Sequence, residues 1–241
     1  MSDTQTNNKP LAAAAGSWWD VSSVTELSDR MVWRLRGCSD LAVRMSRCEA
    51  WRRFCDQTEV WRQKLTGAVT DCSECGECGA IETAGEETVH RYRLCAPAAS
   101  HVKSVFSAYV NDVLLEKDGR NWFVRESVCC GPILEVYSGI ADREADVVTA
   151  SCSLVPDDGG ESVPSFLMRR YGHVIVSGAL YTLFAQDGKP WSDATMARVE
   201  MENWNNGMSE ASLDGIVSER NGAADRTAGR RVNVIPYGIF N

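Results

Sequence analysis

The sequence lacks the motifs that usually mark catalysis, and it also lacks long apolar runs. It contains no phosphate-binding loop, no His-Glu-x-x-His and no Gly-x-Ser-x-Gly segment. The only histidines, His90, His101 and His173, stand in no context that suggests a catalytic triad. No window of about 18 apolar residues occurs, and the first residues do not have the charged start and apolar core of a signal peptide. We therefore expect a protein that is not an enzyme and has no membrane span.

Positive charge is scarce as well. The chain has 25 Lys and Arg residues against 33 Asp and Glu residues, a formal net charge of −8. Proteins that bind nucleic acid tightly are usually basic, so we do not expect this chain to recognise a specific DNA sequence. An acidic surface is compatible instead with a channel through which DNA slides without sticking.

Cysteine, by contrast, is abundant, with 10 residues. Without a signal peptide, we expect these thiols to stay reduced in a cytosol. Cys72, Cys75 and Cys78 have a spacing that can bind zinc or an iron–sulfur cluster, with His90 or Cys95 as a further ligand. No second Cys-x-x-Cys pair follows at finger spacing, so we predict no metal and no cofactor. A small cytosolic metal-binding interaction protein built around this loop is the alternative function.

The N-terminal quarter predicts an arm followed by helices. Residues 1–20 are polar and then alanine-rich, which is typical of a mobile arm. Residues 21–60 predict two helices, the first capped by Ser22 or Ser23 and the second running from Asp40 to Gln57. The apolar stripe of the second helix consists of Leu41, Met45, Cys48, Trp51 and Cys55. Its arginines point elsewhere, either to solvent or to carboxylates of a neighbouring subunit. These inter-subunit candidates are Arg44, Arg47, Arg52 and Arg53.

The period of the apolar residues changes to two after Trp61, which predicts a β-rich insertion over residues 61–160. We expect a hairpin around Asp118-Gly119 between Val113 and Val124. The expected strands or part-strands are Trp61–Thr66, Val89–Leu94, Val102–Leu115, Asn121–Val128, Leu134–Tyr137 and Asp146–Leu154.

Residues 161–218 predict a hairpin of two long helices that completes a helical bundle. Gly188 and Pro190 end the first of them. Gly178 stands in the middle of that helix, where glycine costs about 1 kcal/mol relative to alanine, and this predicts close approach by another helix. The fold class we expect is therefore α+β, with two N-terminal and two long C-terminal helices in a bundle and an antiparallel β-sheet domain inserted between them.

Residues 219–241 lose the helical spacing and predict an extended arm. An apolar end of this kind is a liability unless something covers it. It can dock on its own fold, or it can add to the surface of another protein. The residues of this arm that we expect to make the contacts are Arg230, Arg231, Val232, Val234, Ile235, Pro236, Tyr237, Ile239 and Phe240.

Two strings in the helical parts resemble the head-to-tail adaptor, or connector, proteins of tailed bacteriophages. One string contains Ala50, Phe54, Cys55, Thr58 and Trp61. The other contains Ile175, Gly178, Ala179, Leu180, Leu183, then the turn Gly188-Lys189-Pro190-Trp191-Ser192, then Trp204, Gly207 and Met208. The turn is the most specific piece, and the resemblance covers the helical parts better than the sheet.

The resemblance implies a structural protein at the portal vertex, or neck, of the virion, assembled in the host cytoplasm. Such proteins form a homo-oligomeric ring beneath the portal protein, usually a dodecamer. They extend the DNA channel and offer a docking platform to a tail or nozzle protein. Genomic DNA passes through the ring without sequence-specific binding, and the C-terminal arm binds the portal. A closed ring needs two different complementary patches on each copy.

Overall fold

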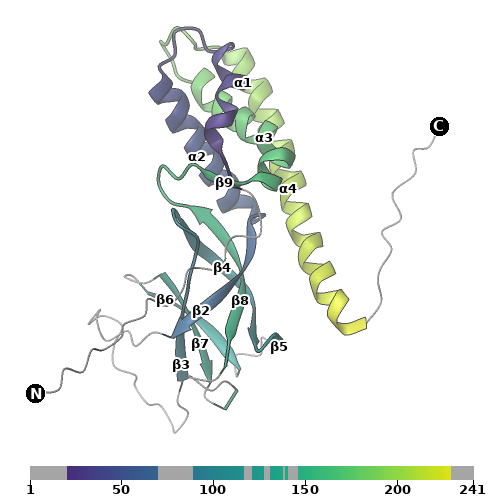
Figure 1. Ribbon diagram of the computed structural model, residues 1–241. Coiled ribbons are helices and arrows are strands. Elements are labelled where there is room, and N and C mark those ends of the chain that lie inside the picture. The colour runs from purple at the N-terminus through teal and green to yellow at the C-terminus, as the bar shows by residue number, and fades with distance from the viewer. Residues whose placement is uncertain are drawn as a thin grey trace, which may run out of the picture.

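The computed structural model describes residues 21–69, 89–116, 121–127, 131–137, 139–140 and 146–228. Within these ranges the helices gather at one end of the molecule and a large curled sheet forms the other end (Figure 1). The chain enters through the helices, builds the sheet, and returns to the helices (Figure 1).

The helical part contains a short 3-10 helix and four α-helices in the described residues. These are η1 (Val24–Leu27), α1 (Asp29–Val32), α2 (Asp40–Thr58), α3 (Ser165–Phe184) and α4 (Ala194–Ala228). The strands are β1 (Val21–Ser23), β2 (Arg62–Val69), β3 (Val89–Leu94), β4 (Ser100–Val110), β5 (Val113–Leu115), β6 (Trp122–Ser127), β7 (Gly131–Tyr137), β8 (Val148–Pro156) and β9 (Ser162–Pro164).

The large sheet has seven strands in the order β5-β4-β8-β2-β3-β7-β6, and every neighbouring pair is antiparallel. It curls into a half-barrel, with two irregularities in the β4–β8 register, between Val102 and Ser104 and between Val105 and Ser107. Bulges of this kind increase the local twist of a sheet. A second sheet joins β1 to β9 and so ties the start of the described chain to the start of α3.

The predicted fold class is wrong. The structure is built on the seven-stranded half-barrel and a second sheet, rather than on a helical bundle that carries an inserted sheet. The predicted first N-terminal helix is reduced to the 3-10 helix and the four residues of α1. Ser23 and Glu26 do form the expected capping box. The helix ends at Val32, and Gly37, which adopts a left-handed conformation with φ of +77°, lies between it and α2. One member of the expected bundle is therefore missing.

The predicted hairpin around Asp118-Gly119 is also wrong. β5 and β6, which would be its two strands, lie at opposite edges of the large sheet. The hairpin instead joins β4 to β5 through Asn111 and Asp112, whose φ angles are +50° and +65°. Two central residues with positive φ make the hairpin turn that fits the twist of its strands, and Asn and Asp tolerate that conformation best after glycine.

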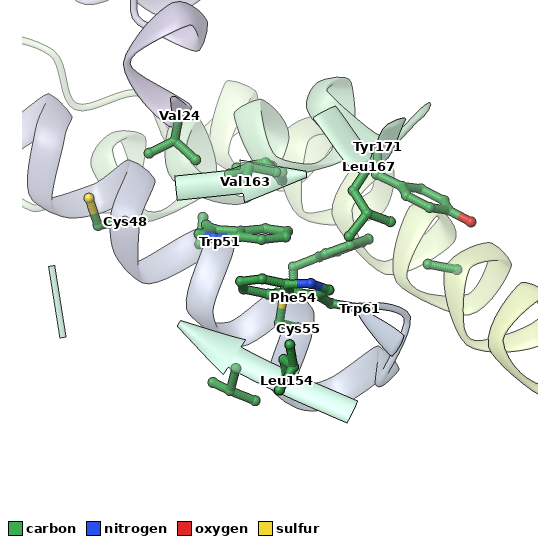
Figure 2. Close-up of a cluster of buried hydrophobic side chains, with 14 of the residues drawn as sticks. Val24, Cys48, Trp51, Phe54, Cys55, Trp61, Leu154, Val163, Leu167 and Tyr171 are labelled. Atoms are coloured by element: carbon green, nitrogen blue, oxygen red, sulfur yellow. The ribbon is translucent and has the colours of Figure 1, made fainter. Parts of the chain in front are cut away.

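Aromatic side chains fill the junction between the helices and the sheet (Figure 2). Trp51 and Phe54 of α2 are fully buried, and the rings of Trp51 and Trp61 stack with their centroids 5.7 Å apart. Leu154 of β8 and Tyr171 of α3 border the same cluster (Figure 2). Aromatic rings bury large areas, so this cluster holds the two ends of the molecule together.

The crossing of α3 and α4 depends on two glycines. A Cβ atom at Gly178 would lie 2.4 Å from the ring of Trp204, and one at Gly207 would lie 2.3 Å from a methyl carbon of Val174. Both distances are too short for real atoms, so only glycine allows the helices to approach this closely. The prediction that Gly178 marks a close helix approach is therefore confirmed. Asp193 caps α4, because its carboxylate accepts hydrogen bonds from the N–H groups of Thr195 and Met196.

Candidate assembly surface of the helices

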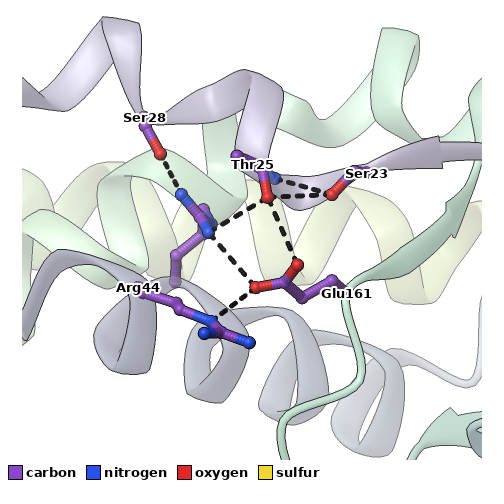
Figure 3. A network of polar contacts seen from close by, with 6 residues as sticks. Ser23, Thr25, Ser28, Arg44 and Glu161 are labelled. Carbon is purple, nitrogen blue, oxygen red and sulfur yellow. Dashed lines mark hydrogen bonds and ion pairs between the residues drawn. The ribbon is translucent and has the colours of Figure 1, made fainter. Parts of the chain in front are cut away.

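Arg44 and Arg47, two of the predicted inter-subunit residues, bind a carboxylate of their own chain. Arg44 Nε lies 2.7 Å from Glu161 Oε1 (Figure 3). The guanidinium of Arg47 lies 3.7 Å from the same oxygen. Arg47 is buried and also donates to the hydroxyl groups of Ser28 and Thr25. Burial lowers the pKa of the Arg47 guanidinium, and the charge of Glu161 opposes that shift. Glu161, which stands between β8 and β9, thus fastens α2 to η1.

The other two predicted arginines form exposed pairs. Arg52 lies 2.8 Å from Asp158, and Arg53 lies 2.7 Å from Glu49 one helical turn away. Exposed pairs of this kind contribute little, about 0–1 kcal/mol. All four arginines therefore have an intrachain partner, and the structure brings only Arg44 and Arg47 into one cluster.

A hollow of about 630 Å³ runs beside α2, and we name it the α2 groove. It is bounded by α2, by the end of α3 with the residue Gln186 just beyond it, and by the turn at Asp158 and Gly159. Leu41 and Met45 border it and are exposed by 65% and 64% of their surface. The groove is lined by Leu41, Ala42, Arg44, Met45, Ser46, Cys48, Glu49, Arg52, Asp158, Gly159, Thr182 and Gln186.

Helix α4 is fastened to α3 near its middle and then continues. The hydroxyl of Tyr171 and the guanidinium of Arg170 both bind Asp214. Burial and the hydrogen bond to Asp214 raise the pKa of Tyr171, so the phenol stays protonated and keeps donating. Beyond Asp214 the helix continues to Ala228, which is about 21 Å at 1.5 Å per residue. Figure 1 shows this end of α4 projecting beyond the other helices.

Two apolar side chains are exposed where α4 leaves the other helices. Leu213 is 64% exposed and Ile216 is 52% exposed, whereas Ala211 and Gly215 on the opposite side are buried. We call Leu213 and Ile216 the α4 ridge. A helix in a globular protein normally buries its apolar residues, and the α4 ridge lies outside the side that α4 buries at Ala211 and Gly215.

A second hollow, of about 560 Å³, lies between α1, α3 and α4 and is polar. The ion pair between Arg34 and Glu200 lies in its wall, with Glu200 buried, and the Arg34 guanidinium also lies 5.7 Å from the centroid of the Phe184 ring. These contacts fasten the segment just after α1 to both long helices. The charges of Arg34 and Glu200 are thus paired within one chain, whereas Arg30 and Glu210 also line the hollow.

Three of the five cysteines in the described ranges are buried, whereas Cys38 is partly buried and Cys95 is exposed. Cys48, Cys55 and Cys152 are buried, as their predicted role as small apolar residues requires. Burial raises the pKa of the Cys152 thiol to about 12 and raises that of Cys55 well above its ordinary value. A thiol that stays protonated is a poor nucleophile and a poor metal ligand. No group of His, Cys, Asp and Glu residues in the described ranges could hold a metal ion.

Several predicted features lie outside the described residues. These are the N-terminal arm over residues 1–20, the loop of Cys72, Cys75 and Cys78, and the contact residues of the C-terminal arm over residues 230–240. The helix search covered the described residues, and it found none that is both long enough and apolar enough to cross a membrane.

Sequence reasoning missed both exposed apolar surfaces. It assigned Leu41 and Met45 to the buried stripe of α2, but only Cys48, Trp51 and Cys55 of that stripe are buried. The buried side of α2 turns toward Val43 and Arg47 instead, because Glu161 and Ser28 hold the arginine there. Val43 and Arg47 are one helical turn apart, but a buried arginine gives no apolar signal. The second long helix was also expected to end at residue 218 and to be followed by an extended arm, whereas α4 continues to Ala228.

No protein-family model matches the chain. A search of curated proteins also finds no match.

Proposed function

We propose that this chain is a structural protein of a tailed-bacteriophage virion, a head-to-tail adaptor that forms a ring of identical copies beneath the portal. The ring extends the DNA channel and carries the tail. Its mechanism is binding rather than turnover, and the acidic composition of the chain suits a wall along which DNA slides.

The observation that carries the proposal is the outer surface of α2 and α4. Both helices expose apolar residues away from the core, at Leu41 and Met45 on α2 and at Leu213 and Ile216 on α4. Such surfaces suit a chain that is covered by neighbours in an assembly. Two different surfaces on one chain are what a ring with head-to-tail contacts requires.

The resemblance to adaptor proteins supports the same proposal. Gly178, Trp204 and Gly207 belong to the string that resembles this family, and these residues set the spacing of α3 and α4. Phe54 and Trp61, from the other string, pack at the junction of helices and sheet (Figure 2). The shared residues are thus those that give the helical part its shape.

Electron cryomicroscopy of phage particles that contain this chain tests the proposal. We expect a ring of density between portal and tail into which the half-barrel and its helices fit. Finding the chain elsewhere in the particle, or absent from it, would contradict the proposal.

A deletion tests the proposed role of the C-terminal arm. Removing Arg230–Asn241 should abolish binding to portal rings of the same phage in a pull-down, while the thermal unfolding of the remaining chain stays unchanged. Undiminished portal binding by the shortened chain would refute the role of the arm.

A further inference from the structure

The polar hollow between α1, α3 and α4 has the size of a small-molecule pocket. Its volume is about 560 Å³, and pockets that bind small molecules typically measure about 300–1,000 Å³. Gly207 lines the hollow without filling it, because it has no side chain. Arg30 lies against α3 at its edge, with Nη1 3.9 Å from the position that a Cβ atom of Gly172 would take.

The walls of the polar hollow carry opposite charges. Arg30 of α1 and Arg34 just after it stand on one wall, and Glu200 and Glu210 of α4 stand on the other. At one end the walls are joined, because Arg34 and Glu200 form an ion pair. Glu210 lies about 15 Å further along α4, at a rise of 1.5 Å per residue. The ion pair therefore leaves the end at Glu210 open.

At that open end the charges stay apart. Within the part of the chain that the structure describes, neither Arg30 nor Glu210 forms an ion pair or a side-chain hydrogen bond. The same holds for the uncharged polar side chains that line the hollow with them, which are Ser177, Asn203 and Asn206. The hollow thus offers a cation, an anion and several hydrogen-bonding groups that the fold itself does not use.

A zwitterion complements this arrangement better than an ion of one sign does. A carboxylate group matches the planar fork of the Arg30 guanidinium, which can bind it through two parallel hydrogen bonds. An ammonium group has three donors for the carboxylate of Glu210. A simple anion would be repelled by Glu210 and a simple cation by Arg30, whereas a molecule with both groups bridges the two walls.

We propose that the polar hollow binds a free α-amino acid, with its carboxylate at Arg30 and its ammonium group at Glu210. In a free amino acid these two groups are next to each other, whereas a peptide carries them at opposite ends. The amides of Asn203 and Asn206 can donate to and accept from a polar side chain of the bound molecule. The inference goes beyond the proposed role in the virion and does not depend on ring assembly.

Isothermal titration calorimetry of the full-length chain with the common α-amino acids tests the inference. We expect at least one of them to bind. Its N-acetyl derivative lacks the ammonium group and its carboxamide lacks the carboxylate, so each should bind about tenfold more weakly or worse. If no amino acid binds, the inference is overturned. Undiminished binding of either derivative would overturn it as well, because one charged group would then suffice.

Two variants assign the charged groups to their residues. Arg30→Gln and Glu210→Gln should each weaken binding of that amino acid about tenfold or more. Glu210→Gln should also bind the amino acid and its N-acetyl derivative equally, because the partner of the ammonium group is gone. By the same argument Arg30→Gln should no longer distinguish the amino acid from its carboxamide. The reverse pairing of variant and derivative would contradict the proposed orientation.

Matched controls separate the hollow from the overall charge of the chain. Arg36→Gln and Glu202→Gln remove the same charges from exposed side chains that do not line the hollow, so binding should stay as in the wild type. Arg30 and Glu210 are exposed too, so thermal unfolding and oligomeric state should be the same for all four variants. A control that weakens binding as much as its partner variant would refute the site and leave the ring proposal untouched.

Discussion

The inner and outer sides of α2 and α4 differ in how completely contacts within their own chain cover them. On the inner sides, Arg47 finds Glu161 and Ser28, and Gly207 lets Val174 approach without a gap. On the outer sides, Leu41 and Leu213 remain largely exposed to solvent. The inner sides hold the fold, and the proposed ring would use the outer sides for assembly. Substitutions on the two sides should therefore affect different measurements.

The largest loss of stability should follow Glu161→Ala. The buried guanidinium of Arg47 would keep its hydroxyl partners but lose its carboxylate, and an uncompensated buried charge costs about 3 kcal/mol or more. Chemical denaturation should show that decrease in the free energy of unfolding. Asp158→Ala is the matched control, because its pair with Arg52 is exposed and should change stability by less than about 1 kcal/mol. Equal effects of the two changes would refute the anchoring role of Glu161.

Closing the space between α3 and α4 should have the next largest effect. Gly178→Ala and Gly207→Ala each place a methyl group inside a neighbouring side chain, and overpacking typically costs about 1–3 kcal/mol. Helix propensity alone predicts the opposite, a gain of about 1 kcal/mol. Thermal unfolding decides the sign, with Asn205→Ala on the exposed side of α4 as the control. Stabilisation by either glycine change would show that the helices cross less closely than described.

Alkaline pH should weaken the fold through its buried thiols. Cys152 titrates near pH 12 in the folded chain, against 9.0 for an ordinary thiol, so between these values the folded state binds more protons than the unfolded state. Stability is therefore intact below pH 9.0 and falls above it, by about 1.4 kcal/mol per pH unit for this group. Denaturation of the wild type and Cys152→Ala at several pH values measures this. A loss above pH 9.0 of the same slope in both proteins would contradict the assignment to Cys152.

The smallest effect on stability should come from the outer sides. Leu41→Gln and Leu213→Gln remove apolar groups that are mostly exposed, so each should change the free energy of unfolding of a dilute, monomeric sample by no more than about 0.5 kcal/mol. Denaturant titration at low protein concentration checks this. A loss as large as that from Gly207→Ala would place these side chains in the core.

Sequence patterns predicted the local structure of the long helices well. The second predicted helix, Asp40 to Gln57, agrees with α2, and the turn at Gly188 and Pro190 lies between α3 and α4. The close approach at Gly178 followed from the cost of a mid-helix glycine. These features depend on residues near one another in the chain, and such interactions leave a readable local signal.

The arrangement of the sheet and the boundary of the core could not be predicted in the same way. β5 and β6 are neighbours in sequence but lie on opposite edges of the large sheet. The reason is that β5 pairs with β4 through the turn at Asn111 and Asp112. The side of α2 that is buried depends on Glu161, which follows it by more than a hundred residues. Pairings at such separations decide register and orientation, and a single sequence does not reveal them.

The number of copies in the assembled state tests the central claim most directly. Electron microscopy of the purified full-length chain, alone and on portal rings, should show a closed ring of identical copies around a central channel. The outer sides of α2 and α4 should lie at the contacts between neighbours. A single copy that remains monomeric under both conditions, with Leu41 and Leu213 still facing solvent, would contradict the account.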